Sequence, residues 1–251
     1  KFDLTGRVAI VTGGSRGIGE AIAMALSEFG ARLVLSSRKM EGLEAARKRV
    51  EAAGGEAVCI PAHVGKIETL QALVDGALEA YGTLDILVNN AATNPVFGPL
   101  MDADQGAWDK IMDVNLKGAF FLSKAAAKVM IEKGKGVIIN ISTEAAVRPT
   151  PMLGVYSISK AGLDMVTKSL ALELGDKGIR VNGIAPGLVQ TRFSQALWAN
   201  EEIRKFAVSK IPMGRMAQPE EIAGLAVFLA SDAASFINGV TVLVDGGAIL
   251  T

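Results

Sequence analysis

Short runs of β-branched and other apolar residues alternate along this chain with longer segments of helical periodicity. The helical pattern is clearest at Gly17–Phe29 and Leu43–Ala53. Seven strands are predicted, at Val8–Val11, Leu33–Ser36, Ala57–Ile60, Ile86–Val88, Val137–Ile141, Val181–Ile184 and Thr241–Val244. Strands that are apolar on both faces are typical of a parallel sheet covered by helices on both sides. The pattern therefore predicts a doubly wound α/β fold.

The chain carries no sign of a boundary between domains. No proline- or serine-rich linker, low-complexity block or internal repeat interrupts the alternation, which predicts a single domain over residues 1–251. Residues 190–216 contain Trp198 and the charged run Asn200–Lys205, but no obvious strand. We interpret this segment as an inserted helical flap, of the kind that often covers a binding site.

Composition excludes several classes of function. Lys plus Arg and Asp plus Glu both count 26, so no net charge draws the chain to nucleic acid or to an anionic membrane. One cysteine, Cys59, and one histidine, His63, allow neither an internal disulfide nor a His/Cys metal cluster. Lys1–Gly6 shows no signal pattern, and no apolar run reaches the ~18 residues that cross a bilayer. We expect a cytoplasmic protein with a small-molecule partner and no metal.

A glycine-rich turn follows the first predicted strand and opens the first predicted helix. The turn is Thr12–Gly19, and its glycines permit a tight bend and a close approach of the backbone to a ligand. The amino terminus of the helix offers free N–H groups and a positive dipole end to a pyrophosphate. Alone, such a turn can simply connect a strand to a helix, but its place in the first βα unit favours a dinucleotide site. The predicted contacts are Gly13, Ser15, Arg16, Gly17, Ile18 and Gly19.

Tyr156 and Lys160 form a second candidate site. If they lie on a helix, their spacing of four residues puts the phenol and the ammonium on one face. A cation beside a phenol favours the phenolate, so we expect the pKa of Tyr156 to be lowered toward acid/base chemistry. The alternative for the isolated pair is a half-buried tyrosine beside a solvated lysine.

Five motifs in order resemble the short-chain dehydrogenase/reductase family over essentially the whole chain. They are Thr12–Gly19, Asn89-Asn90-Ala91, Asn115, Tyr156 with Lys160, and Pro186-Gly187. The resemblance implies a Rossmann fold with a seven-stranded parallel sheet in the order 3-2-1-4-5-6-7 and helices on both faces. Within the family, the chain is similar to the NADPH-dependent carbonyl and retinal reductases at Asn94-Pro95, Phe97-Gly98, Ser36–Lys39 and Ala185–Leu188.

Residues after the second strand indicate which dinucleotide is bound. NAD-binding folds place a carboxylate there to hold the ribose, whereas a 2′-phosphate needs an arginine and no carboxylate. This chain has Ser37 and Arg38, with Arg16 in the glycine turn, which favours NADP(H). If both arginines are only solvated, the choice stays open. The resemblance completes the cofactor site with His63, Val64, Asn90, Ala91, Ala92, Tyr156, Lys160, Pro186, Gly187, Val189 and Thr191.

The resemblance also implies roles for the catalytic group. Tyr156 is the expected proton donor, Lys160 the cation that lowers its pKa and binds the nicotinamide ribose, and Asn115 the holder of a water next to Lys160. The family serine stands thirteen residues before the tyrosine, where this chain has Thr143. Thr143 offers a hydroxyl in place of the serine, and the adjacent Ser142 is the alternative.

These residues predict an NADP(H)-dependent oxidoreductase that interconverts a ketone or aldehyde and its alcohol, with Tyr156 as general acid/base. Alternatives are a catalytically weak dinucleotide sensor, or another reaction of the family such as epimerisation or dehydration. Apolar side chains at Pro95–Gly98, Val147–Val155 and Phe193 suggest a small hydrophobic carbonyl or alcohol substrate. The resemblance implies a homotetramer.

Overall fold

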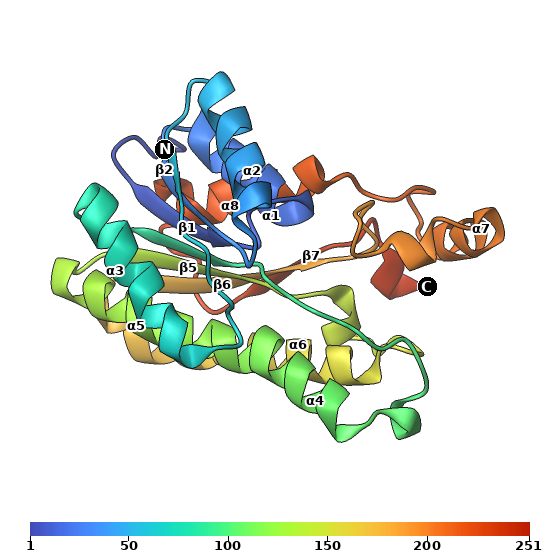
Figure 1. The fold of residues 1–251 in the computed structure, drawn as a ribbon. Coiled ribbons are helices and arrows are strands. Elements are labelled where there is room, and N and C mark those ends of the chain that lie inside the picture. The colour runs from blue at the N-terminus through green and yellow to red at the C-terminus, as the bar shows by residue number, and fades with distance from the viewer.

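The computed structural model describes all residues 1–251 and contains one seven-stranded parallel sheet (Figure 1). Its strand order is β3-β2-β1-β4-β5-β6-β7, so the expected fold and order are confirmed. The strands are β1 (Val8–Thr12), β2 (Arg32–Ser36), β3 (Ala57–Cys59), β4 (Ile86–Asn89), β5 (Gly136–Ile141), β6 (Ile179–Pro186) and β7 (Thr241–Val244). Both ends of each strand lie within two residues of the ends that the apolar runs predict.

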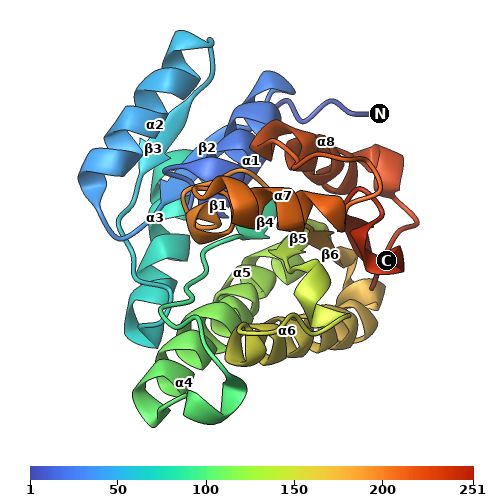
Figure 2. The same ribbon diagram turned by 90° about the vertical axis from the view of Figure 1, so that its right-hand side faces the viewer.

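Helices cover both faces of the sheet (Figures 1 and 2). They are α1 (Gly17–Glu28), α2 (Met40–Ala52), α3 (Leu70–Tyr81), α4 (Gln105–Met112), α5 (Gly118–Lys133), α6 (Gly154–Leu174), α7 (Glu201–Ser209) and α8 (Pro219–Ala230). Helices α1, α2 and α8 share one apolar core with the Ala9 and Val11 face of β1. Helices α3, α5 and α6 share the other with Val8 and Ile10. Successive residues of a strand point to opposite faces, which explains why β1 is apolar throughout.

Two boundaries differ from the sequence prediction for identifiable reasons. Helix α2 begins at Met40 rather than Leu43, because its first turn is exposed and carries no apolar stripe. Strand β6 extends from Ile179 to Pro186, beyond the predicted Val181–Ile184, because the sheet continues to pair Gly183–Pro186 with β7. Pairing along a neighbouring strand is a tertiary effect that a local apolar pattern does not contain.

The segment between β6 and α8 is helical, and α7 lies in its second half. A short 3₁₀ turn at Gln195–Leu197 precedes α7, and Val189 forms a bridge with Ala217 where the segment leaves and rejoins the body. In Figure 1, α7 lies beyond the ends of the strands, and in Figure 2 it lies in front of the sheet. The segment therefore stands next to the edge at which the strands end. No helix has the length and apolar character that a bilayer span requires.

Leu26 provides a test of the core between α1 and the sheet. Leu26→Ala should lower the free energy of unfolding by about 3 kcal/mol, because it leaves a cavity in close-packed surroundings. Ile203→Ala on α7 is the control, since Ile203 is 46% exposed and Leu26 is 0% exposed. Its effect should stay within about 0.5 kcal/mol. Urea unfolding measures both, and equal losses would contradict this account of the core.

Candidate active site

The turn between β1 and α1 depends on the missing side chains of its glycines. Gly13 and Gly17 have φ values of 66° and 58°, in the left-handed region that favours glycine. A Cβ on Gly19 would lie 2.3 Å from Nδ2 of Asn90 and 2.5 Å from the carbonyl oxygen of Gly13. The backbone of the turn and the first turn of α1 therefore approach each other more closely than any other residue would allow.

Hydrogen bonds from two polar side chains join this turn to the end of β4. The hydroxyl of Thr12 donates to the carbonyl of Val88 (3.2 Å) and accepts from the N–H groups of Asn90 (3.0 Å) and Ala91 (3.1 Å). Nδ2 of Asn90 donates to the carbonyl of Thr12 at 2.9 Å. Asn90 and Ala91 thus lie against the glycine turn, and their contact with a cofactor stays a prediction. No role was predicted for Thr12, although a hydroxyl residue at the end of an apolar strand was the available signal.

The amino terminus of α1 is open to a ligand. Its N-cap residue is Arg16, whose side chain makes no capping hydrogen bond, so N–H groups of the first turn lack a side-chain partner. Arg16 is exposed at this end of the helix. Free N–H groups, a positive helix end and the close backbone approach at Gly19 fit the pyrophosphate of a dinucleotide.

Other predicted cofactor residues gather at the same edge of the sheet. A Cβ on Gly17 would lie 3.4 Å from Cγ2 of Thr191, so the segment after β6 reaches the glycine turn. Arg38 is exposed at the end of β2, and no acidic residue lies between Ser36 and Lys39. The remaining predicted residues lie after β2, β3, β4 and β6, at the ends of those strands: Ser37, His63, Val64, Ala92, Pro186, Gly187 and Val189.

Tyr156 and Lys160 lie on the first two turns of α6. The side chain of Lys160 is buried, at 2% exposure, and its ammonium donates to the carbonyl of Ile141 at the end of β5 (2.6 Å). The same ammonium is 6.0 Å from the ring centroid of Tyr156. The alternative of a solvated lysine is therefore wrong, because α6 packs this face against the carboxyl end of β5.

Burial, rather than the neighbouring cation, decides the titration of this pair. It raises the pKa of Tyr156 above its ordinary value and lowers the pKa of Lys160 to about 8. The expectation that Lys160 lowers the pKa of Tyr156 is not met in this structure, because the hydrogen bond of the ammonium goes to Ile141 and the ammonium stays 6.0 Å from the centre of the ring. The phenol stays protonated throughout the neutral range.

Asn115 lies in a π-helical turn, Asp113–Lys117, that joins α4 to α5. Its Oδ1 accepts from the N–H of Thr93 (2.8 Å), and its Nδ2 donates to the carbonyl of Thr93 (3.0 Å) and to the hydroxyl of Ser159 (3.1 Å). Ser159 in turn donates to the carbonyl of Tyr156 at 2.7 Å. Asn115 therefore clamps the segment after β4 to the helix that carries Tyr156. Sequence analysis missed Thr93 and Ser159, although Ser159 stands inside the run Tyr156–Lys160.

Ser142 and Thr143 point to opposite sides at the end of β5, as consecutive residues of extended chain do. Ser142 is 3% exposed, and its hydroxyl is buried without a hydrogen-bond partner beside Asp164 of α6, whose pKa it lowers. Thr143 is half-buried, and its hydroxyl accepts from the N–H of Ala145 at 3.3 Å. Of the two hydroxyls, that of Thr143 is the more accessible.

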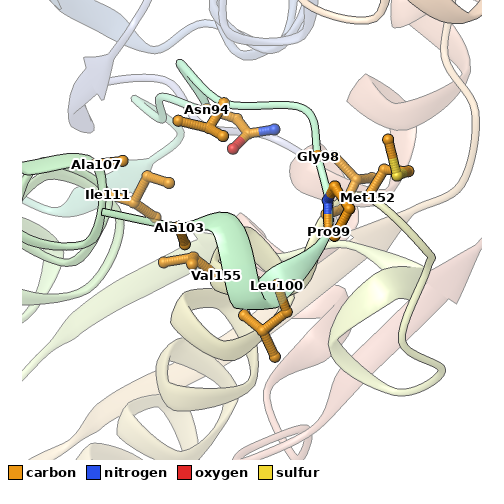
Figure 3. Close-up of a pocket in the computed structure, with 12 residues that line it drawn as sticks. Asn94, Gly98, Pro99, Leu100, Ala103, Ala107, Ile111, Met152 and Val155 are labelled. Carbon is orange, nitrogen blue, oxygen red and sulfur yellow. The ribbon is translucent and has the colours of Figure 1, made fainter. Parts of the chain in front are cut away.

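Apolar side chains lie beside Tyr156 and near the start of α6. The ring of Phe193, from the segment between β6 and α8, lies 5.8 Å from the ring of Tyr156 between centroids. A shallow, mainly apolar hollow lies between the segment after β4 and the start of α6, and Figure 3 shows its lining, including Leu100, Met152 and Val155. The N–H of Gly98 donates to the carbonyl of Met152 at 3.1 Å, which ties the two sides of this hollow together.

Known proteins share this arrangement. A family model described as "Enoyl-(Acyl carrier protein) reductase" matches residues 13–248. "Dehydrogenase/reductase SDR family member 4" of Oryctolagus cuniculus is 44% identical over 245 residues, which are 98% of this chain and 94% of that protein. The chain belongs to the short-chain dehydrogenase/reductase family. The family resemblance of its motifs is thereby confirmed.

Two further similar proteins place this short-chain dehydrogenase/reductase among NAD(P)-dependent oxidoreductases. "Glucose 1-dehydrogenase 2" of Bacillus subtilis (strain 168) is 42% identical over 250 residues, covering 99% of this chain and 96% of that protein. The crystal structure of a gluconate 5-dehydrogenase from Burkholderia cenocepacia J2315, in complex with NADP and tartrate, is 35% identical. It has a TM-score of 0.95 and covers 100% of this chain and 98% of that one.

Gly19 tests whether the turn of this short-chain dehydrogenase/reductase holds a dinucleotide. Gly19→Ala should weaken NADPH binding about tenfold or more, because the new Cβ pushes Asn90 and the turn apart. Gly224→Ala in α8 is the control, since a Cβ there meets nothing within 4 Å. Titration of each variant with NADPH, followed by protein fluorescence, measures the two affinities. Unchanged binding by Gly19→Ala would contradict the assignment of the turn.

Proposed function

We propose that this chain is an NADP(H)-dependent oxidoreductase that interconverts a ketone or aldehyde and the corresponding alcohol, with Tyr156 as general acid/base. The observation that carries the proposal is the meeting of two groups at one edge of the sheet. The glycine turn with the open end of α1 suits a dinucleotide, and Tyr156 with the buried Lys160 suits proton transfer. When bound, the dinucleotide supplies or accepts a hydride.

The charge at the end of β2 supports NADP(H) over NAD(H). Arg38 is exposed after β2 and Arg16 is exposed at the start of α1, and no carboxylate lies between Ser36 and Lys39 to hold ribose hydroxyls. Guanidinium groups bind phosphates through charge-assisted, forked hydrogen bonds. The residues that would hold the pyrophosphate are Gly13–Gly19, and those that would hold the nicotinamide ribose are Tyr156 and Lys160.

Each catalytic side chain has a defined part in carbonyl reduction. The phenol of Tyr156, whose pKa burial raises, is protonated at neutral pH and donates its proton to the carbonyl oxygen as the hydride arrives at carbon. The half-exposed hydroxyl of Thr143 donates a hydrogen bond to the developing alkoxide. Ser142 has no such role in this proposal, because its hydroxyl faces α6 and lies beside Asp164. Asn115 keeps the segment after β4 and the helix of Tyr156 together, and its expected water contact stays a prediction.

The lining of the site favours a hydrophobic substrate. Phe97, Val147 and Phe193 are exposed on the segments that flank Tyr156, and Met152 borders the hollow. Exposed apolar side chains gathered at a site indicate an apolar ligand. Similar proteins named for glucose and gluconate act on polar molecules, whereas the similarity to SDR family member 4 agrees with the carbonyl reductase branch.

We also propose a homotetramer. Four large apolar side chains are exposed on two helices. Helix α6 exposes Ile158, Met165 and Leu172, and α4 exposes Trp108. Apolar side chains left uncovered on two neighbouring helices suit burial against another copy. Sedimentation equilibrium measures the assembly.

Replacement of the phenol tests the proton donor. Tyr156→Phe should lower the rate of NADPH-dependent reduction of aromatic ketones by about 10³-fold, because no other acid takes its place. Its affinity for NADPH should change little. Tyr81→Phe is the matched control, since Tyr81 is the chain's second tyrosine and its hydroxyl bonds the carbonyl of Leu33 away from this site. Normal turnover by Tyr156→Phe would remove Tyr156 from its role.

Reversal of charge tests the choice of cofactor. Arg38→Asp should weaken NADPH binding by about ten- to a hundredfold and leave NADH binding equal or tighter, because the guanidinium no longer meets the 2′-phosphate. Lys48→Asp makes the same charge change at an exposed position of α2. Titrations with both dinucleotides measure the preference. Equal NADPH affinities of Arg38→Asp and the unaltered protein would show that Arg38 faces solvent only.

A further inference from the structure

Lys160 carries a charge that its surroundings do little to solvate. The side chain is 2% exposed, and its one hydrogen bond is to the carbonyl of Ile141. A buried ammonium is costly unless hydrogen bonds or an opposite charge offset its lost hydration. The site therefore needs a negative group near Lys160, and neither Tyr156 nor Thr143 supplies one.

Asp164 is the acidic residue in position to do so. It stands one helical turn after Lys160 on α6, so both side chains lie on the face that packs against the sheet. The hydroxyl of Thr241, at the start of β7, donates to Oδ1 of Asp164 at 3.2 Å. The hydroxyl of Ser142, at the end of β5, is close enough to lower the pKa of Asp164. Side chains from the end of β5 and the start of β7 thus both lie near the carboxylate on α6.

Gly183 makes room for this arrangement. Gly183 of β6 pairs with Thr241 of β7, and a Cβ on Gly183 would lie 2.4 Å from the hydroxyl oxygen of Thr241. Any larger residue would push that hydroxyl away from α6. The glycine in the middle of strand β6 is therefore explained by the contact between Thr241 and Asp164.

We propose that Asp164 is a positioning residue of the active site, which keeps Lys160 charged and in place without touching the substrate. The proposal rests on the proposed role of Tyr156 and Lys160. Asp164 acts on the ammonium from one turn away, while the ammonium itself bonds Ile141 and faces the phenol. The hydroxyl of Thr241 donates a hydrogen bond to the carboxylate, which favours its charged form.

The causes of the pKa shift of Lys160 agree in direction with this proposal. Burial lowers the pKa of Lys160 to about 8, and Asp164 opposes that fall. Burial raises the pKa of Asp164, while Ser142, Thr241, Lys160 and the nearby Lys168 lower it. A lysine is charged below its pKa, so Lys160 is charged at neutral pH and loses its charge as pH rises through about 8. Without the carboxylate, that loss moves to lower pH.

Asp164→Asn removes the charge at nearly constant shape and tests the proposal. With lysine labelled by ¹³C at Cε, and the Lys160 resonance assigned from its absence in Lys160→Arg, NMR titration reads the pKa of Lys160 directly. Asp164→Asn should lower that pKa by about 1 to 2. Asp164→Glu should keep it near the value of the unaltered protein. The control is Asp176→Asn, whose side chain is 78% exposed and pairs with Lys177.

An unchanged pKa of Lys160 in Asp164→Asn would overturn the proposal. A second measurement needs no variant: the carboxyl carbon of Asp164 should show a deprotonated group at pH 7, and a protonated one would overturn the proposal equally. The alkaline limb of ketone reduction should move to lower pH in Asp164→Asn by the same amount as the pKa. The NMR titration measures the pKa of Lys160 and does not depend on turnover. If that pKa shifts as expected but the protein reduces no ketone, the proposed function is contradicted and the role of Asp164 is not.

Discussion

A parallel sheet covered by helices on both faces forces the carboxyl ends of all its strands to one edge. In this chain the glycine turn, Asn90, Thr143 and Gly187 each follow a strand, so the fold alone brings them to that edge. The edge also receives the amino termini of α1 and α6, with their unpaired N–H groups. The site is therefore a consequence of the direction of the strands, and a few polar side chains adjust its details.

Those side chains act mainly by holding backbone. Thr12 and Asn90 bond the ends of β1 and β4 to each other, and Asn115 bonds the segment after β4 to Ser159 of α6. All three are buried or half-buried, and Thr12 and Asn90 lie at strand ends, where backbone groups leave the ladder and need other partners. The phenol of Tyr156, the proposed proton donor, is thus positioned by hydrogen bonds between other groups of the protein.

The sequence was sufficient for the strands, the glycine turn and the pairing of Tyr156 with Lys160, because these depend on periodicity and on motifs of fixed spacing. The strand order followed from the family resemblance of those motifs. The sequence was not sufficient for the pKa of Tyr156, which depends on how deeply α6 buries the phenol and on Ile141 taking the ammonium of Lys160. It also missed Thr12 and Ser159, since a single hydroxyl in an apolar or helical run predicts nothing until its partner is known. Long-range hydrogen bonds of this kind exist only in the folded chain.

The central claim is that this edge of the sheet transfers a hydride from a nicotinamide to a carbonyl carbon. Incubation of the unaltered protein with an aromatic ketone and NADPH that carries two deuterons at C4 tests it most directly. The account predicts an alcohol with one deuterium on its carbinol carbon, formed in step with oxidation of the dinucleotide. NADPH that binds tightly while no deuterium reaches any ketone or aldehyde offered would contradict it, and would leave a dinucleotide-binding protein without redox activity.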